Sequence, residues 1–436
     1  MRASFREPGE TNSKQSPSQE QQQQQHHQSL AARIQKLAST SVAPLAAMAV
    51  LLSPGAFMND GGAAYAGLPG ADPVKDGRIL LRNALPINGK NPIRVVQREL
   101  ESINEALRVP GVKFSAVNSA VKRSQSIVSS SKKREAILSD VNPDRRAAAE
   151  MRLDAIQRDL SDFETIVDNK DKQEVPVIQQ KILAQVGEVE EDMVSGFPFE
   201  IPTDYAQLPQ LKGRATLEMK LRFANPVSRS LEFDRATLKI VVDGYNAPIS
   251  AGNFVDLVMR KFYDDMEIQR SDGFVVQTGD PQGQATGFVD PGSGEVRRIP
   301  FEVMVEKQNM PVYEETLEEL GRFNEQPVLP FNAFGTMAWA RSEFEPNSAS
   351  SQFFFLLRDS ELTPSGSNLL DGRYAVFGYV TEGKDYLESL QVGDKIESVK
   401  VLDGADNLVR KQQEPPPAAE PAASSEPTAA DATNVA

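Results

Sequence analysis

Two different spacings of apolar residues divide the chain. Between residues 91 and 194 apolar residues recur every three or four positions, as on one face of a helix. Two runs show this spacing most clearly: Ile93, Val96, Leu100, Ile103 and Leu107, and then Leu153, Ile156, Leu160, Phe163 and Val167. From Ala215 onward, β-branched and aromatic runs separated by glycine replace that period, which is typical of strands. The pattern therefore predicts a helical region followed by a β-rich region.

The helical region has three predicted breaks, near Pro110-Gly111, Asn142-Pro143 and Val175-Pro176. They leave four amphipathic helices, and each asparagine in Asn91-Pro92 and Asn142-Pro143 is placed to cap a helix whose first turn accepts the proline. Each apolar stripe is too narrow to stand alone, so the helices should share the core of an α-helical bundle. Such a bundle is either purely structural or carries a surface for a partner protein, and the spacing is compatible with both.

Prolines and composition mark the predicted boundaries. Phe197-Pro198, Ile201-Pro202 and Leu208-Pro209 interrupt any helix and favour an extended linker. The β-rich region holds a long insertion, residues 295–331, with a short acidic helix predicted at Glu314–Leu320. We therefore expect five segments, which are a targeting presequence at 1–66, the α-helical bundle at 67–194, a proline-rich linker at 195–212, a closed antiparallel β-barrel at 213–403 and a disordered tail at 404–436.

The first segment has the features of an export signal. An apolar run from Val42 to Phe57 follows Arg33 and Lys36 and precedes Ala64-Tyr65-Ala66, a small-residue cleavage pattern. The run is shorter than the roughly 20 residues that a membrane-spanning helix needs. A cleaved signal, with a mature chain that begins near Gly67, is the preferred interpretation, and an anchor or a buried helix is the alternative.

Composition excludes several kinds of chemistry. The chain has no cysteine, so disulfides, thiolate nucleophiles and cysteine-ligated metals are excluded. Both histidines, His26 and His27, fall in the predicted presequence, which leaves the mature protein without an imidazole base or metal ligand. We expect no metal and no cofactor. Five basic and four acidic residues precede residue 67, so this segment has a net charge of +1. The whole chain has a net charge of −14, and the rest of the chain therefore has a net charge of −15, which opposes binding to nucleic acid.

The segment from Ile268 to Asp280 sets a permanent cation just before a strand. Arg270 is followed by Gly-Phe-Val-Val-Gln, which predicts a loop closing into a strand whose alternate side chains share a face. Arg270, Phe274 or Val275, and Gln277 can then converge on one ligand. Residues 335–340 and 350–357 predict two further buried strands, and residues 369–378 a turn into a third. Together these blocks predict a peptide-binding site.

In this order the blocks resemble the cyclophilin family of peptidyl-prolyl isomerases, over roughly residues 213 to 402. The resemblance implies a closed antiparallel barrel that isomerises X-Pro bonds, with Arg270 as the catalytic residue. It implies that the proline pocket and peptide groove are formed by Phe274, Val275, Gln277, Ala338, Trp339, Ala340, Gln352, Phe354, Leu369, Leu370 and Tyr374.

The resemblance extends beyond the barrel. The helical segment, the phrase Asp243-Gly244-Tyr245-Asn246-Ala247-Pro248 and the long insertion resemble the multidomain cyclophilins of the thylakoid lumen, which act in photosystem II assembly. This implies a lumenal isomerase that assists the folding and assembly of photosynthetic membrane complexes. Its partners would be proline-containing segments, with lumenal loops of photosystem II subunits among them.

Two alternatives stay open. One is a proline-peptide-binding chaperone or assembly factor with little turnover, favoured by Leu369 where many family members have tryptophan and by a segment between Arg270 and Phe274 that is one residue shorter than usual. The other is a scaffold that works through its helices alone. We also expect the bundle to dock on the barrel and limit access to Arg270, with the acidic residues 314–319 meeting the basic residues 132–134.

Overall fold

The computed structural model describes residues 74–108, 112–194, 196–358 and 368–410. The predicted presequence, the break near Pro110-Gly111 and the part of the predicted tail beyond Arg410 lie outside these residues. None of the described helices combines the length and hydrophobicity that a membrane span requires.

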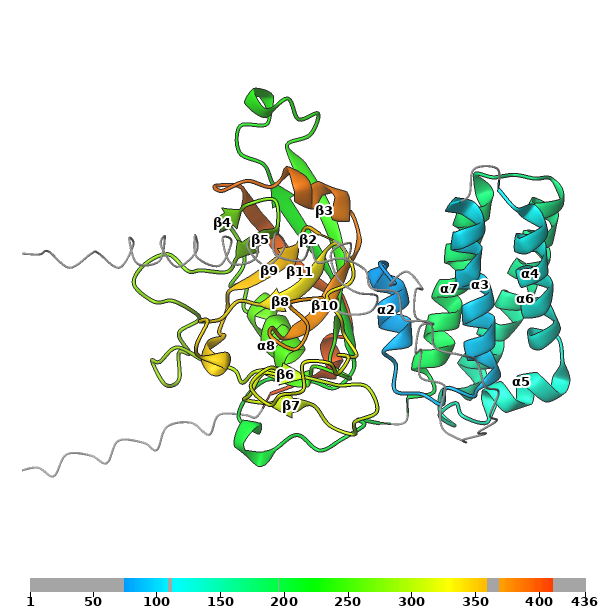
Figure 1. The fold of residues 1–436 in the computed structure, drawn as a ribbon, viewed down its shortest axis with the longest axis horizontal. Coiled ribbons are helices and arrows are strands. Elements are labelled where there is room, and N and C mark those ends of the chain that lie inside the picture. Colours follow the sequence, from blue (N-terminus) through cyan, green and yellow to red (C-terminus); the bar gives the residue numbers. More distant parts are fainter. Residues whose placement is uncertain (1–73, 109–111, 195, 359–367, 411–436) are drawn as a thin grey trace, which may run out of the picture. The chain divides into compact units, whose positions relative to one another are not determined.

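The helical region contains α3 (Pro92–Arg108), α4 (Phe114–Val128), α5 (Ser131–Leu138), α6 (Arg146–Asp168) and α7 (Glu174–Glu191), coloured blue to green in Figure 1. The two predicted apolar stripes lie on α3 and α6, where Ile93, Leu100, Ile156 and Phe163 are among the residues that form a shared buried core. We call α3 to α7 the bundle. The prediction that narrow apolar stripes pack together is confirmed.

Some predicted helix ends are wrong. Asn91 does cap α3, since its Oδ1 accepts the N–H of Ile93 at 3.0 Å, but Asn142 does not cap α6 and instead donates to the carbonyl of Val194. Helix α7 begins before Pro176, whose missing N–H costs nothing in a first turn. The sequence also gives no break between α4 and α5, where Ser130 is extended.

The β-rich region forms a closed barrel with the strand order β10-β3-β2-β11-β4-β5-β9-β8, every pair antiparallel (Figure 1). The strands are β2 (Arg214–Arg222), β3 (Arg235–Asp243), β4 (Met266–Ser271), β5 (Val275–Thr278), β8 (Thr336–Trp339), β9 (Phe353–Leu356), β10 (Val376–Glu382) and β11 (Lys395–Asp403). Helix α8 (Pro248–Met259) packs against them and is buried along most of its length. The predicted fold class, a helical bundle followed by a closed antiparallel barrel, is confirmed.

Aromatic side chains fill the barrel core. Phe254 of α8 packs within 5.2 Å of the rings of both Phe353 and Phe377, and Trp339 stacks on Phe377 at 4.8 Å. Short 3₁₀ helices join the larger elements, at η1 (Thr203–Tyr205), η2 (Val227–Arg229), η3 (Pro346–Ser348), η4 (Lys384–Ser389) and η5 (Ala405–Asn407).

The predicted linker and tail are more ordered than expected where they meet. Strand β1 (Gln210–Leu211) pairs with β12 (Leu408–Val409), so the end of the predicted linker and the start of the predicted tail form one small sheet. Leu211 is fully buried there, and a Cβ on Gly252 would meet the carbonyl oxygen of Pro209 at 2.5 Å. Two-residue strands carry no periodic signal, and the tertiary contact alone orders them. The other predicted domain boundaries stay predictions.

Helix α2 (Gly77–Asn83) was placed by the sequence in the bundle, yet its apolar residues join the barrel core. Leu80, Leu81 and Ala84 are buried in that core, and Gly77 lies so close to Tyr379 that a Cβ would meet the Tyr379 Cβ at 2.7 Å. A helix of seven residues is too short for its pattern to show which core it serves.

The insertion contains a hairpin of β6 (Glu302–Val303) and β7 (Val312–Tyr313), but no helix at Glu314–Leu320. Thr316 and Glu319 do form the reciprocal hydrogen bonds of a capping box, with Glu319 Oε2 2.8 Å from both the N and Oγ1 of Thr316. Gly321, at φ 69°, then ends the turn before a helix can extend. The acidic residues form the capping box expected at the start of a helix, but the predicted helix at Glu314–Leu320 is absent.

Arg214 joins three segments that are far apart in the sequence. Its guanidinium donates to Asp243 Oδ2 at 2.7 Å, to Glu191 Oε1 of α7 at 3.2 Å and to the carbonyl of Leu81. Asp243 is fully buried and cannot be hydrated, so the ion pair with Arg214 compensates for the loss of contact with water. Arg214 therefore fixes α2 and the end of α7 against the strands β2 and β3.

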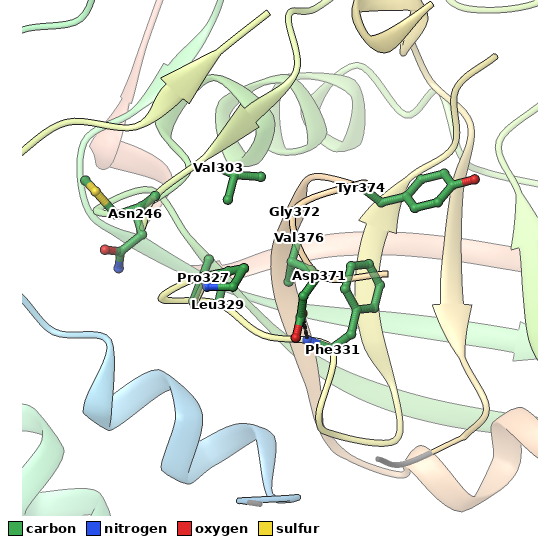
Figure 2. Close-up of a pocket in the computed structure, with 10 residues that line it drawn as sticks. Asn246, Val303, Pro327, Leu329, Phe331, Asp371, Gly372, Tyr374 and Val376 are labelled. Carbon is green, nitrogen blue, oxygen red and sulfur yellow. Dashed lines mark hydrogen bonds between the residues drawn. The ribbon is translucent and has the colours of Figure 1, made fainter. Parts of the chain in front are cut away.

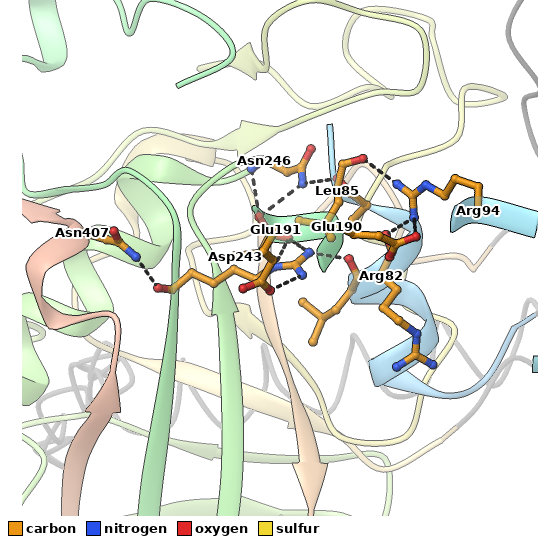
Figure 3. Close-up of polar contacts among 11 residues, drawn as sticks. Arg82, Leu85, Arg94, Glu190, Glu191, Asp243, Asn246 and Asn407 are labelled. Atoms are coloured by element: carbon orange, nitrogen blue, oxygen red, sulfur yellow. Dashed lines mark hydrogen bonds and ion pairs between the residues drawn. The ribbon is translucent and has the colours of Figure 1, made fainter. Parts of the chain in front are cut away.

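A second arginine, Arg94 of α3, donates to the carbonyls of Arg82 and Leu85 at 2.8 and 3.0 Å and lies 3.4 Å from the carboxylate of Glu190 (Figure 3). Glu190 is fully buried, and among the described residues neither of its oxygens accepts a hydrogen bond. Burial raises the pKa of Glu190 to about 7, although Arg94 and Arg82 act to lower it.

The predicted contact between the acidic insertion and residues 132–134 is not formed. Glu318 pairs with Arg373, Glu319 with Thr316, and Arg134 with Asp154. The polar contacts that tie the bundle to α2 and the barrel fall on Arg214, Arg94 and Arg82, and none of them involves the strand that carries Arg270. Masking of Arg270 by the bundle has no support in these contacts.

We expect Arg214→Ala to lower the free energy of unfolding by about 3–5 kcal/mol, because the buried Asp243 loses its ionic partner and keeps only the hydrogen bonds that Asn246 donates to its Oδ1. Arg222→Ala on the same strand is the matched control and should cost less than about 1 kcal/mol, since Arg222 pairs with an exposed Asp265. Urea unfolding followed by circular dichroism measures both variants. Equal losses would show that Arg214 has no special role.

Glu190→Gln should change how stability depends on pH. The folded-state pKa of about 7 lies above the ordinary 4.5, so the folded protein holds a proton that the unfolded chain releases. This contribution is complete below pH 4.5 and is lost as the pH rises through 7. We expect the variant to match the wild type at low pH and to exceed it by about 2 kcal/mol at pH 8.

Glu188→Gln is the control, because Glu188 lies on the same helix but is exposed and pairs with Arg152. Unfolding midpoints measured from pH 4 to 8 compare the three proteins. A Glu190→Gln variant whose stability tracks that of the wild type over the whole range would contradict the prediction.

Candidate active site

Four of the predicted site residues lie in one row across four neighbouring strands. Arg270 of β4 is opposite Gln277 of β5, Gln277 is opposite Phe354 of β9, and Phe354 is opposite Ala338 of β8. Residues directly opposite each other in antiparallel strands project to the same face. Their neighbours in sequence, among them Val276, Phe355 and Met337, are fully buried in the barrel core on the other face.

The two predicted glutamines contact each other. Gln277 Nε2 donates to Gln352 Oε1 at 3.0 Å, and Gln352 Nε2 donates to Asp280 Oδ1 at 2.9 Å and to the carbonyl of Thr286 at 3.1 Å. Gln352 is thereby held in one orientation beside the row. A held amide can offer hydrogen bonds to an extended peptide with little loss of side-chain entropy.

Phe354 belongs to a cluster of aromatic side chains. It is stacked on Phe331 with ring centroids 6.0 Å apart, and the ring of Tyr374 meets it edge-on at 5.5 Å. Arg341 lies over the face of Tyr374, 5.0 Å from its centroid, and donates to the carbonyl of Arg373. Phe331 and Arg341 were not predicted. Nothing in the sequence separates Phe331 from an ordinary core residue at the end of the insertion.

The turn that follows residue 367 holds Phe331 in place. Asp371 accepts the N–H of Phe331 and the N–H of Asn368, both at 2.8 Å, and Asn368 Nδ2 donates to the carbonyl of Phe331 at 2.9 Å. Gly372, at φ 70°, lies so near Leu317 that a Cβ would meet the Leu317 side chain at 2.6 Å. Glycine is therefore required at this turn.

A small pocket, partly open to solvent, is lined by Phe331 and Tyr374. Figure 2 shows Asp371 and Phe331 side by side at its wall, with the hydroxyl of Tyr374 directed away. Burial raises the pKa of Asp371 to about 6. The lining residues are Asn246, Val303, Met304, Pro327, Leu329, Phe331, Asp371, Gly372, Tyr374 and Val376.

The remaining predicted residues differ in how they are placed. Phe274, Ala340 and Leu370 are partly buried against the barrel core, Val275 is buried, and Leu369 is 49 % exposed. Trp339 is only 1 % exposed and belongs to the aromatic core, so its side chain does not line a groove and only its backbone can contact a ligand. The alternation along β8 explains this, because Ala338 and Trp339 face opposite sides.

Arg270 does not stand alone. Asp272 Oδ2 accepts from Arg270 Nε at 2.8 Å and from Nη2 at 2.5 Å, while Asp272 Oδ1 accepts the N–H groups of Phe274 and Val275 at 2.9 Å. Partial burial alone would raise the pKa of Asp272, but the two N–H groups and Arg270 outweigh it and lower the pKa below its ordinary value. Asp272 is therefore a carboxylate at neutral pH.

Comparisons with known protein families match two regions of the chain. Residues 76–194 match the family model of the "CYP38-like, PsbQ-like domain" of peptidyl-prolyl cis-trans isomerases, and residues 230–408 match that of the "Cyclophilin type peptidyl-prolyl cis-trans isomerase/CLD".

Three relatives each match 77 % of this chain. The chloroplastic peptidyl-prolyl cis-trans isomerase CYP38 of Arabidopsis thaliana is 49 % identical over 338 residues, covering 77 % of this chain and 76 % of that protein. A putative thylakoid lumen peptidyl-prolyl cis-trans isomerase of Synechocystis is 47 % identical, covering 77 % and 84 %. The chloroplastic CYP37 of Arabidopsis thaliana is 32 % identical over 347 residues, covering 77 % and 71 %.

We expect Phe331→Ala to lower the free energy of unfolding by about 3–5 kcal/mol, because a fully buried ring that supports Phe354 is removed. Phe323→Ala in the same insertion is the control, since Phe323 is 68 % exposed, and should change stability by no more than about 0.5 kcal/mol. Chemical denaturation measures both. A Phe331 variant as stable as the control would show that packing of the ring against Phe354 contributes little to stability.

Proposed function

Because the chain belongs to the cyclophilin family of peptidyl-prolyl cis-trans isomerases, we propose that its reaction takes place at the row of Arg270, Gln277 and Phe354. Arg270 is the catalytic residue in this proposal. The proline ring is held by Phe274, Val275, Phe354 and Leu370, and the peptide backbone by Gln277, Gln352 and the segment from Ala338 to Ala340.

The reaction requires little more than a fixed cation beside an apolar pocket. Rotation about an X-Pro bond meets a barrier of roughly 18–20 kcal/mol, because amide resonance must be broken. In the twisted amide the proline nitrogen becomes pyramidal and gains a lone pair, which a guanidinium donor stabilises more than it stabilises the planar ground state. Arginine suits this role since it stays charged and presents its donors in a rigid fork.

The observation that carries the proposal is the register of the three strands. Adjacent strands lie about 4.8 Å apart, so Arg270 and Phe354, two strands apart, are separated by about 10 Å at the backbone. An arginine side chain and a phenylalanine ring that extend toward each other from these positions can bracket a single prolyl residue. Gln277, on the strand between them, faces the same ligand.

A second candidate is a chaperone or assembly factor that binds proline-containing peptides with little turnover. It is favoured by the ion pair between Arg270 and Asp272, which occupies Nε and Nη2 of the guanidinium. Exposure of Leu369 favours it as well, because an exposed leucine closes the pocket less than a buried one.

We further propose that the protein acts in the thylakoid lumen in the assembly of photosynthetic membrane complexes. Two relatives support this location through their names, which place one in the chloroplast and the other in the thylakoid lumen. The match of residues 76–194 to a PsbQ-like domain supports a role at photosystem II. The expected clients are proline-containing lumenal loops of photosystem II subunits.

Arg270→Ala should lower kcat/KM for a proline-containing tetrapeptide by about 10²–10³-fold, the size of effect that follows loss of one positioned donor to a developing charge. The thermal midpoint should stay near that of the wild type, since Arg270 is partly exposed. Arg298→Ala is the control, because Arg298 is an exposed arginine that also has an acidic partner, Glu345. A protease-coupled isomerisation assay measures all three proteins.

Equal activity in the wild type and Arg270→Ala would refute the catalytic role. If neither protein isomerises the peptide but the wild type binds it in calorimetry, the chaperone alternative is correct. The client proposal is tested with synthetic lumenal-loop peptides of photosystem II subunits. Peptides in which alanine replaces proline should bind more weakly, and equal binding would refute recognition of proline.

A further inference from the structure

The loop that joins β4 to β5 places a carboxylate against the catalytic guanidinium. Asp272 lies two residues after Arg270, and its Oδ2 accepts both Nε and Nη2 of the Arg270 side chain. The loop is short, and Gly273 at φ 76° allows it to turn back toward the strand. An isomerase that depends on the field of one arginine thus has the opposite charge in direct contact with that arginine.

The two oxygens of Asp272 have separate tasks. Oδ1 accepts the N–H groups of Phe274 and Val275 and so holds the turn, in the manner of an Asx turn. Oδ2 contacts only the guanidinium among the described residues. The turn therefore needs one acceptor oxygen, while the ion pair needs the second oxygen and the negative charge. A purely structural role would be complete with Oδ1 alone.

The ion pair opposes transition-state stabilisation in two ways. First, Asp272 occupies the Nε and Nη2 donors of Arg270, which could otherwise donate hydrogen bonds to the twisted prolyl amide. Second, the negative charge of Asp272 reduces the positive electrostatic potential at the proline nitrogen. The pair is only partly buried, with side chains 25 % and 35 % exposed, so a bound peptide can displace it at a cost in rate.

We propose that Asp272 is a positioning residue that lowers the isomerase rate, acting as an internal counter-ion that withholds the Arg270 guanidinium from the substrate. The inference rests on the proposed catalytic role of Arg270. It predicts that removal of the charge, with the turn left intact, makes this protein a faster isomerase rather than a slower one.

Asp272→Asn tests the proposal, because the asparagine oxygen can still accept the N–H groups of Phe274 and Val275 while its NH₂ group cannot accept from Arg270. We expect kcat/KM for a proline-containing tetrapeptide to rise about tenfold, mostly in kcat, with peptide affinity in calorimetry changed less than about threefold. Asp265→Asn is the matched control. Asp265 immediately precedes β4 and also pairs with an arginine, Arg222 of β2. Its substitution should leave the rate unchanged.

The double variant Arg270→Ala with Asp272→Asn separates the ion pair from an effect on the turn. We expect it to have the rate of Arg270→Ala alone, because Asp272 acts only through the guanidinium. A rate increase of equal size in the Arg270→Ala background would overturn the proposal, and so would an Asp272→Asn protein no faster than the wild type. If Asp272→Asn proves unstable in thermal unfolding, Asp272→Ser supplies a smaller acceptor for the turn, and the same outcomes apply.

The two proposals fail in different ways. Arg270→Ala with the activity of the wild type refutes the catalytic role itself. A clear loss in Arg270→Ala together with no gain in Asp272→Asn leaves the catalytic role standing and refutes the counter-ion.

Discussion

The pairing of β4, β5, β9 and β8 is the constraint on which the rest of the site depends. Side chains alternate between two faces along each strand, so the residues that fill the core decide which residues face outward. Val276, Phe355 and Met337 are fully buried on one face, and Arg270, Gln277 and Phe354 lie on the other. A slip of one residue would drive Arg270 into the aromatic core. Packing around Phe353 and Trp339 therefore secures the site as much as it secures the fold.

The insertion is part of this arrangement and supplies the support of the pocket. Both oxygens of Glu302 accept N–H groups at the start of α8, from Ile249 at 3.2 Å and Ser250 at 2.8 Å, and Tyr313 donates to the same carboxylate at 3.0 Å. Burial raises the pKa of Glu302 to about 7 despite these donors. The carboxylate thus joins the insertion to the helix N-terminus, where negative charge is stabilised. Further along the insertion, Phe331 stacks on Phe354. The insertion is therefore attached to the barrel at two places, Glu302 and Phe331.

The sequence predicts what is periodic and misses what depends on single contacts. The stripes of α3 and α6 and the strands that bear Arg270, Gln277 and Phe354 follow from spacing and from the resemblance to cyclophilins. Strands β1 and β12 have two residues each, too few for any period, and they exist because residues 210 and 409 meet in the folded chain. Trp339 faces the core because of its position in the alternation of side chains along β8, and a sequence motif does not show which face a strand residue takes. Asp272 was overlooked because its effect depends on where its second oxygen points.

Two ion pairs show how exposure decides what the same chemistry does. Arg214 and Asp243 have side chains 9 % and 0 % exposed, so separating them would leave charges without water, and the pair is permanent. Arg270 and Asp272 are 25 % and 35 % exposed, and water can solvate both groups if they separate. On the proposed role of Arg270, only the second pair can therefore exchange its partner for a substrate. The proposed catalytic arginine has to be held by a weak partner or by none, since a buried partner would hold it in place permanently.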